Sequence, residues 1–428
     1  MYPNREQERR MLNTIEACRH LWNDALSHRK RRWEEERKST TYNLQQWILT
    51  AVRKSDTETG QVYSQVAQDV LNRLDKSFKS FFSGNTRYPK FKEDRGSGSF
   101  TYPQAYNGSV KPDPSRKRLF LSKLGNIKTI FHIPIPRDSV LKTCTITRES
   151  CDEWYASLNY EDIIPLQGIG GPSTPISRPI GVDLGLKALM TTSDVMEVLP
   201  PKFLRQAENR LRRLQESLTR KKKGSKNRWK ARTRVATQHA KVARQRKDTN
   251  HKLSNRLVNE HDLIGFEDLH IGGMVRNYRL AKSILDAGWG QLVEFTEYKA
   301  VRLGIAFVKV SSMNSTRECF FCGSLNEVTL DMREFNCVGC GRLLKRDLNG
   351  ARNVLKRALK KVGQGRRLVD VRLGDESRYQ GVPELKPVET RTLLVPANGR
   401  AIRVFESGTR KPIMGNWDVT RFSAGRHA

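Results

Sequence analysis

The stretch PIGVDLGLKALMTTSD, residues 179–194, decides the fold of this chain. It places Asp183 inside an apolar run that is typical of a core strand, and Gly185 then allows a turn into a second apolar run. A carboxylate is seldom buried without a partner, because removing a charge from water is unfavourable. We therefore expect other parts of the chain to supply a partner for Asp183.

The charge of the chain indicates a polyanionic partner. Its 428 residues are enough for roughly two to four domains with a sizeable core. They include 78 Lys and Arg against 45 Asp and Glu, which gives a formal net charge of +33. Such an excess of positive charge repels itself unless a polyanion neutralises it. The composition therefore favours a protein that binds nucleic acid.

Membrane insertion and secretion are not indicated by the sequence. No apolar run of about 18 residues is present to span a bilayer. The opening residues, MYPNREQERR, are polar where a secretory signal would be apolar. We therefore expect a cytoplasmic protein without a membrane partner.

Changes in composition along the chain divide it into five segments. Apolar residues at helical spacing predict a helical lobe over residues 1–86, and strand-like alternation predicts a β-rich domain, a barrel, over 87–165. Residues 166–178 are rich in Gly, Pro and Ser, which is typical of a linker. A further domain follows over 179–372. The basic, Pro-rich tail, 373–428, is poorly periodic, and we expect it to be disordered.

A dense basic region lies within the domain that follows the linker. Residues 202–260 combine leucines and valines at helical spacing with many Lys and Arg side chains, and Trp229 lies among them. This pattern fits either a charged, solvated helical hairpin or a surface that binds phosphate backbone, and the overall charge favours the second. The candidate nucleic-acid contacts are Lys221, Lys222, Lys223, Arg228 and Lys230.

Four of the seven cysteines have the spacing of a metal site. They form C-x2-C-x14-C-x2-C, with a glycine directly after each pair. Two such knuckles bring four thiolates around one Zn²⁺, and glycine allows the backbone to turn tightly there. Four protein ligands leave no open position, so we expect a structural rather than a catalytic zinc ion. The predicted ligands are Cys319, Cys322, Cys337 and Cys340.

Three acidic residues are candidates for the chemistry. Asp183 lies in a strand, Glu267 ends the strand LIGFE, and Asp347 begins a helix. In an RNase H-like fold, adjacent strand ends and a neighbouring helix bring such carboxylates together. Two Mg²⁺ ions about 4 Å apart, held by these oxygens, can activate a water and stabilise the leaving oxygen of a phosphodiester.

Each acid also has a simpler explanation. Asp347 fits a helix cap, and Glu267 fits an exposed charge at a strand end. The DLG turn after Asp183 also occurs in sugar-kinase and chaperone-type ATPases, but the Gly-rich phosphate loops that those proteins need are missing here. The combination of three acids with a zinc ribbon in a basic chain favours the nuclease hypothesis.

Together these motifs resemble the RuvC nuclease of the TnpB family, transposon-encoded RNA-guided endonucleases related to compact type V CRISPR effectors. The resemblance covers residues 179–358. The segments that carry it are IGVDLGLKAL, GFEDLHIGGM, SILDAGWGQLVEFTEYKAVRLGIAFVKV and CFFCGSLNEVTLDMREFNCVGCGRLLKRDLNGARNVL.

The resemblance implies a role for each candidate residue. Asp183, Glu267 and Asp347 become the three RuvC acids, and the cysteines become a zinc ribbon over residues 316–346, inserted before the third acid. Arg333 falls at the basic position of the family between the cysteine pairs, where it is either a phosphate contact or a surface charge.

The resemblance also implies an architecture and partners. We expect an α/β multidomain protein, with an RNase H-like RuvC domain, an inserted zinc ribbon, an N-terminal helical recognition lobe and a β-barrel wedge domain. Guide RNA and double-stranded target DNA are the implied partners, with one chain per guide RNA. Guide pairing then selects the target, and the protein holds the backbone and a short flanking motif.

Four functions stay open from the sequence. The leading hypothesis is a Mg²⁺-dependent, RNA-guided DNA endonuclease with a single RuvC site. The first alternative is an RNA-guided repressor that binds DNA without cutting it, although such relatives have lost one or more acids. A compact CRISPR effector and a strand-transferring transposase are the others.

Overall fold

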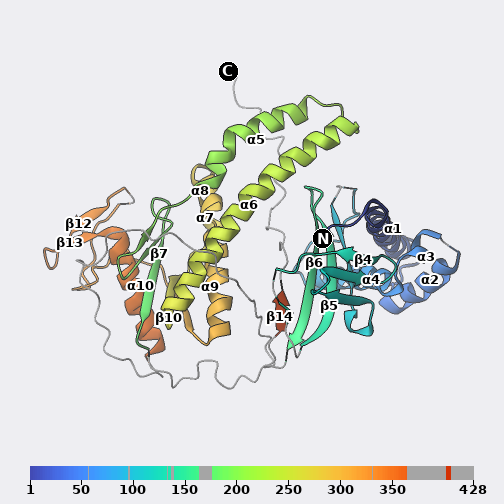
Figure 1. The fold of residues 1–428 in the computed structure, drawn as a ribbon. Coiled ribbons are helices and arrows are strands. Elements are labelled where there is room, and N and C mark those ends of the chain that lie inside the picture. Colours follow the sequence, from blue (N-terminus) through green and yellow to red (C-terminus); the bar gives the residue numbers. More distant parts are fainter. Residues whose placement is uncertain are drawn as a thin grey trace. The chain divides into compact units, whose positions relative to one another are not determined.

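The computed structural model describes residues 1–55, 57–94, 97–132, 134–135, 139–162, 176–329, 331–363 and 402–405. These residues form two compact units (Figure 1). The first unit contains Met1–Asp162 and a short strand near the C-terminus, and the second lies within Ile163–Ala401. Most of the predicted linker and most of the predicted disordered tail lie outside the described residues.

The helices of the first unit follow the apolar spacing of the sequence. The first helix begins with a capping box, in which the Asn4 side chain accepts from the backbone N–H of Gln7 and the Gln7 side chain accepts from that of Asn4. The helices are α1 (Arg5–Glu36), α2 (Tyr42–Ser55), α3 (Thr57–Gln61) and α4 (Ser64–Phe82).

The strands of the first unit form two antiparallel sheets. One has the order β1-β5-β6-β14 and the other β2-β3-β4, with a 3-10 turn, Ala105–Asn107, between β1 and β2. Within the described residues no strand of one sheet pairs with the other, so the barrel stays a prediction. The strands are β1 (Gly98–Tyr102), β2 (Val110–Asp113), β3 (Arg118–Leu121), β4 (Gly125–Lys128), β5 (Ser139–Arg148), β6 (Trp154–Asp162) and β14 (Ile402–Phe405).

Helices and strands of the first unit share one hydrophobic core. Met11 and Leu26 of α1 and Leu74 of α4 belong to the same buried cluster as Phe100 of β1 and Ile146 of β5. The sequence predicts a helical lobe and a separate β-rich domain here, whereas the structure joins them in one compact unit. The short strand β14 extends the sheet next to β6, although the sequence predicts disorder throughout the tail.

The second unit is built on a five-stranded mixed sheet with the order β11-β10-β7-β8-β9. Strands β7, β10 and β11 are parallel, and β8 and β9 are antiparallel to their neighbours. The strands are β7 (Pro179–Leu184), β8 (Met190–Thr192), β9 (Glu197–Val198), β10 (Leu263–Glu267) and β11 (Ala306–Val310). The helices are α5 (Phe203–Thr219), α6 (Lys226–Glu260), α7 (Ile271–Met274), α8 (Tyr278–Ala287), α9 (Trp289–Leu303) and α10 (Arg346–Val362).

Alternation along the strands gives the sheet two different faces. Ile180, Val182 and Phe266 join the core beneath α6, α8 and α9, whereas Leu263 and Val310 pack with α10 on the other face. Figure 1 shows the helix α10 on one side of β7 and β10, with α6 and α9 on the other. Asp183 and Glu267 share the strand parity of the residues that face α10.

Two glycines allow α10 to lie unusually close to the sheet. Gly181 and Gly265 are register partners on the neighbouring strands β7 and β10. A Cβ at Gly181 would lie 2.2 Å from the carbonyl oxygen of Ala351, and one at Gly265 would lie 2.8 Å from the Cβ of Ala358. Only glycine fits such a close approach of helix and strand. The spacing fixes how near the start of α10 lies to the ends of these strands.

Two smaller features complete the second unit. A two-stranded antiparallel ribbon, β12 (Glu334–Asn336) and β13 (Leu343–Lys345), lies between β11 and α10, and β13 ends at the residue before α10 begins. Helices α5 and α6 form a long hairpin (Figure 1). No helix in the described part of the chain is long and apolar enough to cross a bilayer.

Candidate active site and metal centre

Two of the three predicted acids lie side by side at the carboxyl ends of the central strands. Asp183 and Glu267 directly follow Val182 and Phe266, the last residues at which β7 and β10 pair with each other. Both are buried, with 7% and 6% of their surface exposed. Parallel strands end at the same edge of a sheet, so residues far apart in sequence meet there. The polar edge explains why an aspartate lies in this core strand.

The environment of this pair favours the protonated form of Asp183. Burial raises the pKa of Asp183 well above its usual range, and the charges of Glu267 and Asp347 raise it further. Burial also raises the pKa of Glu267, but Ser315, Arg357 and a hydrogen bond with Asp183 counteract this. The Oε1 atom of Glu267 is buried and has no hydrogen-bond partner among the described residues.

The third predicted acid lies close by but is already engaged. Asp347 is in the first turn of α10, near enough to Asp183 for its charge to raise the pKa of that carboxyl. Its Oδ2 accepts from Nη1 of Arg333 at 3.1 Å, and its Oδ1 accepts from Nη2 of Arg346 at 2.8 Å. The structure therefore brings Arg333, the predicted phosphate contact, to the acidic site. Arg346 was not among the predicted residues.

The donor set of this edge suits a hard divalent cation. Carboxylate oxygens are the ligands that Mg²⁺ prefers, and the unpartnered Oε1 of Glu267 is a buried oxygen that a cation can use. The carboxylate oxygens of the three acids do not all lie within 4.8 Å of one another, so they form a looser group than the four cysteine sulfurs. Among the described residues, the groups within this distance are the four cysteines and a second set, Glu149, Cys151 and Glu153.

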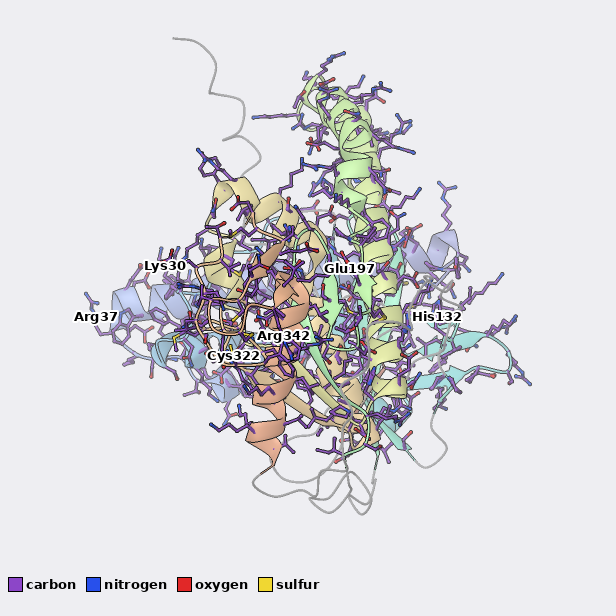
Figure 2. All side chains as sticks on the ribbon, turned by 90° about the vertical axis from the view of Figure 1, so that its left-hand side faces the viewer. Lys30, Arg37, His132, Glu197, Cys322 and Arg342 are labelled. Atoms are coloured by element: carbon purple, nitrogen blue, oxygen red, sulfur yellow. The ribbon has the colours of Figure 1, made fainter. Side chains whose placement is uncertain are left out.

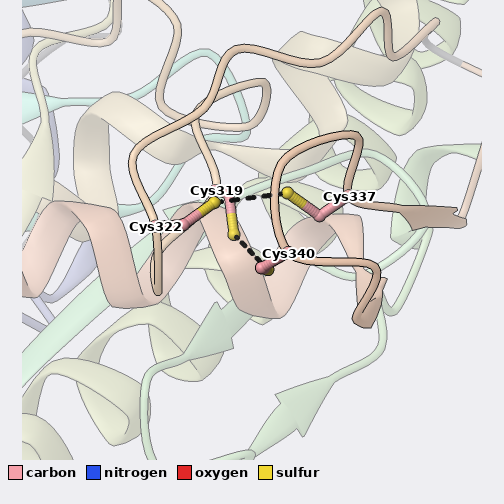
Figure 3. Close-up of side chains that lie close together, drawn as sticks. All are labelled: Cys319, Cys322, Cys337 and Cys340. Atoms are coloured by element: carbon pink, nitrogen blue, oxygen red, sulfur yellow. Dashed lines mark hydrogen bonds between the residues drawn. The ribbon is translucent and has the colours of Figure 1, made fainter.

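The four predicted zinc ligands form one cluster (Figure 3). Their sulfur atoms all lie within 4.8 Å of one another, and the Sγ atoms are 3.8 Å apart for Cys319 and Cys340 and 3.4 Å apart for Cys322 and Cys337. Four cysteine sulfurs that surround a common centre are a donor set suited to zinc. The cluster thus fits the predicted zinc site.

Both knuckles use the same turn. Gly323 and Gly341 have φ values of +79° and +72°, and their N–H groups donate to the carbonyls of Cys319 and Cys337. Side chains with a Cβ are strained in this left-handed region, which explains the glycine after each cysteine pair. The side-chain and backbone hydrogen bonds of Ser324 lower the pKa of Cys322 to about 6, so this thiol readily becomes the thiolate that a metal binds.

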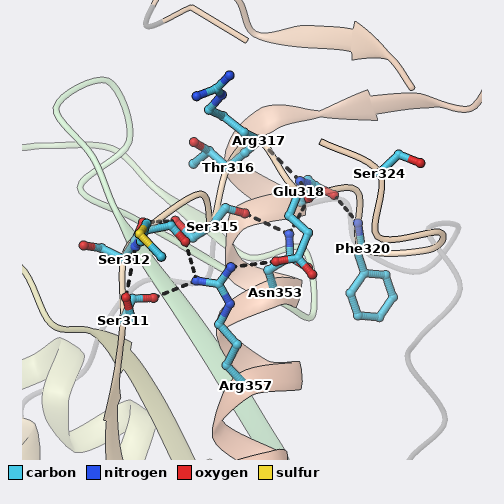
Figure 4. Close-up of polar contacts among 12 residues, drawn as sticks. Ser311, Ser312, Ser315, Thr316, Arg317, Glu318, Phe320, Ser324, Asn353 and Arg357 are labelled. Atoms are coloured by element: carbon cyan, nitrogen blue, oxygen red, sulfur yellow. Dashed lines mark hydrogen bonds and ion pairs between the residues drawn. The ribbon is translucent and has the colours of Figure 1, made fainter. Parts of the chain in front are cut away.

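Sequence reasoning missed a set of polar side chains that connect the ribbon to the acidic site. Asn349, Asn353 and Arg357 follow one another at intervals of four residues along α10. Figure 4 shows Asn353 and Arg357 reaching the segment that precedes the first knuckle. Their i, i+4, i+8 spacing, which puts three polar side chains on one face of a helix, is the signal that could have revealed them.

The predicted nucleic-acid contacts cluster at the tip of the α5–α6 hairpin. Lys221, Lys222, Lys223 and Lys230 are exposed, and Trp229 is 47% exposed beside them. Figure 2 shows nitrogen-tipped side chains along both helices of the hairpin. Arg228 differs, because its Nη1 donates to the carbonyls of Leu218 and Lys221 and closes the turn.

Comparison with known proteins gives three matching family profiles. The profile described as "Probable transposase" matches residues 167–278, and "Cas12f1-like, TNB domain" matches 289–354, which contain the ribbon and the start of α10. A third, "Helix-turn-helix domain", matches residues 1–38, where the structure has the single helix α1.

A solved structure titled "Cryo-EM structure of the Cas12f1-sgRNA-target DNA complex" aligns with 81% of this chain and 82% of that chain. The TM-score is 0.49 and the identity 14%.

Some relatives are similar over most of their length, and others over a shorter part. A protein of Streptomyces pristinaespiralis named "Putative RNA-guided DNA endonuclease" is 32% identical over 84% of this chain and 88% of that protein. "Putative RNA-guided DNA endonuclease InsQ" of Escherichia coli is 31% identical over 82% of this chain and 89% of that protein. "TnpB-like protein L79" of Acanthamoeba polyphaga mimivirus is 23% identical over 42% of this chain and 37% of that protein. Given the first two matches and the transposase profile across β7 and β10, the chain belongs to the TnpB family.

Proposed function

We propose that this protein is an RNA-guided DNA endonuclease that cuts its target next to a short flanking motif at the single acidic site of the second unit. The observation that carries the proposal is the buried pair Asp183 and Glu267 at the ends of neighbouring parallel strands, with Asp347 close by. The names of the relatives, RNA-guided DNA endonuclease in both long matches, support the same activity.

The finer architecture is part of the proposal. The strand order, with three antiparallel strands continued by two parallel ones and helices on both faces, supports an RNase H-like RuvC domain. The four-cysteine cluster supports a structural Zn²⁺ within a ribbon over residues 316–346. For the first unit, the helices and the two sheets support a recognition lobe and wedge that hold the guide RNA and the flanking motif.

In the acidic site, Asp183, Glu267 and Asp347 would hold two Mg²⁺ ions. When bound, these ions would supply an activated water and stabilise the leaving oxygen of the phosphodiester. Asp183 and Glu267 contribute buried oxygens in a site that excludes bulk water, which strengthens their hold on a cation. Arg333, whose Nη1 lies 3.1 Å from Oδ2 of Asp347, would contact the phosphate of the strand to be cut.

Guide RNA and double-stranded DNA would be the partners, with one chain per guide RNA. Target choice would come from base pairing, and the protein would hold backbone through its basic surfaces. The exposed lysines at the tip of the α5–α6 hairpin are suited to this, and Trp229 offers a face for a stacked base. Arg228 contributes by closing the turn that presents them.

The decisive test is cleavage by the Asp183→Ala variant. With a matched guide, a plasmid target and Mg²⁺, the wild-type protein should linearise the plasmid. The variant should lose cleavage but keep its affinity for guide RNA, because Asp183 contributes oxygens to the site rather than an RNA contact. Asp248→Ala, which removes an exposed carboxylate of α6, should cleave like the wild type.

Two outcomes would contradict the proposal. A wild-type complex that binds matched DNA without cutting it would instead be an RNA-guided repressor. Loss of guide RNA binding in a folded Asp183→Ala variant would mean that this residue acts in assembly rather than in hydrolysis.

A further inference from the structure

One segment lies between the acidic site and the zinc cluster, and α10 holds it along its length. This pre-ribbon segment, residues 311–320, runs from the end of β11 to the first knuckle. It has no regular strand or helix of its own. The carbonyls of Ser312 and Asn314 accept from N–H groups within the segment, and the other carbonyls need partners from elsewhere. Three side chains of α10 supply them.

The contacts are made to the backbone in sequence order (Figure 4). Nη1 of Arg357 donates to the carbonyls of Ser311 and Met313 at 2.7 and 2.8 Å. Nδ2 of Asn353 donates to the carbonyls of Ser315 and Glu318 at 2.8 and 2.6 Å. Nη2 of Arg357 also pairs with the Glu318 carboxylate at 2.7 Å.

Asn349 contacts the knuckle itself. Its Oδ1 accepts from the backbone N–H of Phe320, next to the zinc ligand Cys319, at 2.9 Å. Its Nδ2 donates to the carbonyl of Glu318 at 2.8 Å. Asn349 and Asn353 are both buried, with 2% and 1% of their surface exposed.

The middle of the pre-ribbon segment lies against the acids. Ser315 interacts with the Glu267 carboxyl and lowers its pKa. A Cβ placed at Gly350 would lie 3.2 Å from Cγ2 of Thr316 and 3.4 Å from Oδ2 of Asp183, so these groups surround one small space. A shift of the segment would therefore change the surroundings of both buried carboxylates.

We propose that Asn349, Asn353 and Arg357 are positioning residues that couple the zinc ribbon to the acidic site. Zinc fixes the first knuckle, Asn349 joins that knuckle to α10, and Asn353 and Arg357 hold Ser315 and Thr316 against Glu267 and Asp183. The inference rests on the proposed function only in that the acids hold a divalent cation. It predicts that losing the zinc and losing the α10 contacts weaken the same cation site by the same route.

The test is a double-mutant cycle with Asn353→Ala and Cys322→Ser in the full-length protein. The primary readout is Mn²⁺ affinity, measured by calorimetry without nucleic acid. The Asp183→Ala protein, which lacks one of the acids, serves as the reference for Mn²⁺ binding elsewhere on the chain. Each single variant should weaken Mn²⁺ binding by about tenfold, as losing the groups that orient metal ligands commonly does. If both act through one route, the double variant should also lose about tenfold, not a hundredfold.

Matched variants separate positioning from folding. Lys356→Gln removes an exposed charge from the same helix and should leave Mn²⁺ affinity unchanged. If circular dichroism finds Asn353→Ala unfolded, Arg357→Gln, at a less buried position, takes its place in the cycle. It should weaken Mn²⁺ binding by the same factor of about ten. Asn353→Ala should retain one zinc per chain, because it removes no ligand.

Two results would overturn the inference. One is unchanged Mn²⁺ affinity in a folded Asn353→Ala or Arg357→Gln protein, and the other is a hundredfold loss in the double variant, which means two independent routes. Cleavage assays on the same proteins keep the proposed function separate. If the cycle behaves as expected while the wild type cuts no DNA, the coupling stands and the nuclease assignment fails.

Discussion

At the scale of single residues, Lys299 of α9 is a buried cation with neutral partners. It is 3% exposed, and its Nζ donates to the carbonyl of His251 at 2.9 Å and to Oγ of Ser254 at 2.6 Å. Burial lowers the pKa of Lys299 to about 7, because a charge is less stable away from bulk water. The helix α9 therefore contains a group that changes charge near neutral pH in the folded protein.

This lysine predicts a pH dependence of stability. Between pH 7 and 10.5 the unfolded chain binds a proton at Lys299 that the folded chain does not, so the free energy of unfolding should rise with pH in that window. The contribution is at most about 1.4 kcal/mol per pH unit. Below pH 7 both states carry the charge and the contribution to the slope disappears.

The measurement is denaturant unfolding of the wild type and Lys299→Met between pH 7 and 10. The methionine variant should have a smaller slope, because it lacks the group, and other titrating groups cancel in the difference. Equal slopes would mean that Lys299 is charged in the folded protein across the window.

At the scale of elements, the contact between α10 and the sheet sets the geometry of the acidic site. Gly181→Ala would put a Cβ 2.2 Å from a backbone oxygen of α10, which cannot move aside as a side chain can. We expect a loss of about 1 to 3 kcal/mol in the free energy of unfolding, typical of overpacking, and slower cleavage because Asp183 and Asp347 move apart. Thermal unfolding and a cleavage time course measure the two effects.

Gly290→Ala in α9 is the matched control. A Cβ there meets nothing nearer than 3.5 Å, and alanine is favoured over glycine in a helix by about 1 kcal/mol. It should raise the unfolding temperature, whereas Gly181→Ala should lower it. Two variants that shift stability alike would contradict the close packing of α10 on β7.

Local pattern predicts that Asp183 lies in a buried strand and that the four cysteines gather, as the structure has them, but it does not predict the long-range contacts. The apolar run around Asp183 and the cysteine spacing are visible in the sequence, because strand period and knuckle geometry depend on near neighbours. The hydrogen bond from Asn353 to the carbonyl of Ser315 joins residues 38 apart in the sequence. Every residue has a backbone carbonyl, so the residue type of Ser315 does not indicate that it is the acceptor.

At the scale of the whole molecule, charge dominates the expected behaviour. With a net charge of +33, affinity for nucleic acid should fall steeply with salt, because each phosphate contact releases a counterion. Some of these phosphate contacts are expected at the tip of the α5–α6 hairpin, where the lysines are exposed. Neutralising Lys221, Lys222 and Lys223 to Gln should lower the slope of log affinity against log salt by about 2 to 3 for guide RNA.

Fluorescence anisotropy with guide RNA at several salt concentrations measures that slope. A variant with Gln at Lys356 and Lys360, exposed on α10, is the control for charge loss elsewhere on the second unit. An identical slope in the hairpin variant and the wild type would remove the tip from the RNA-binding surface.

Domain boundaries were harder to predict than domains. The change from helical to strand-like periodicity in the first unit is real, and α4 ends at Phe82 before β1 begins at Gly98. Yet the buried faces of both parts meet in one core, as the shared cluster of Leu74 with Ile146 shows. Periodicity tells which face of an element is buried but not against which partner.

The ribbon is rooted at both ends on a single helix, since the pre-ribbon segment is bonded to α10 and β13 runs directly into it. The outer part of the ribbon, between Cys322 and Cys337, is therefore held in place at both of its ends. Arg333, within this part, donates to Asp347, so it is the chain between Cys322 and Arg333 whose length can change as in a surface loop, at little entropic cost, without disturbing the carboxylates. Related proteins are thus expected to differ in the length of this outer part while they keep the contacts between the ribbon and α10.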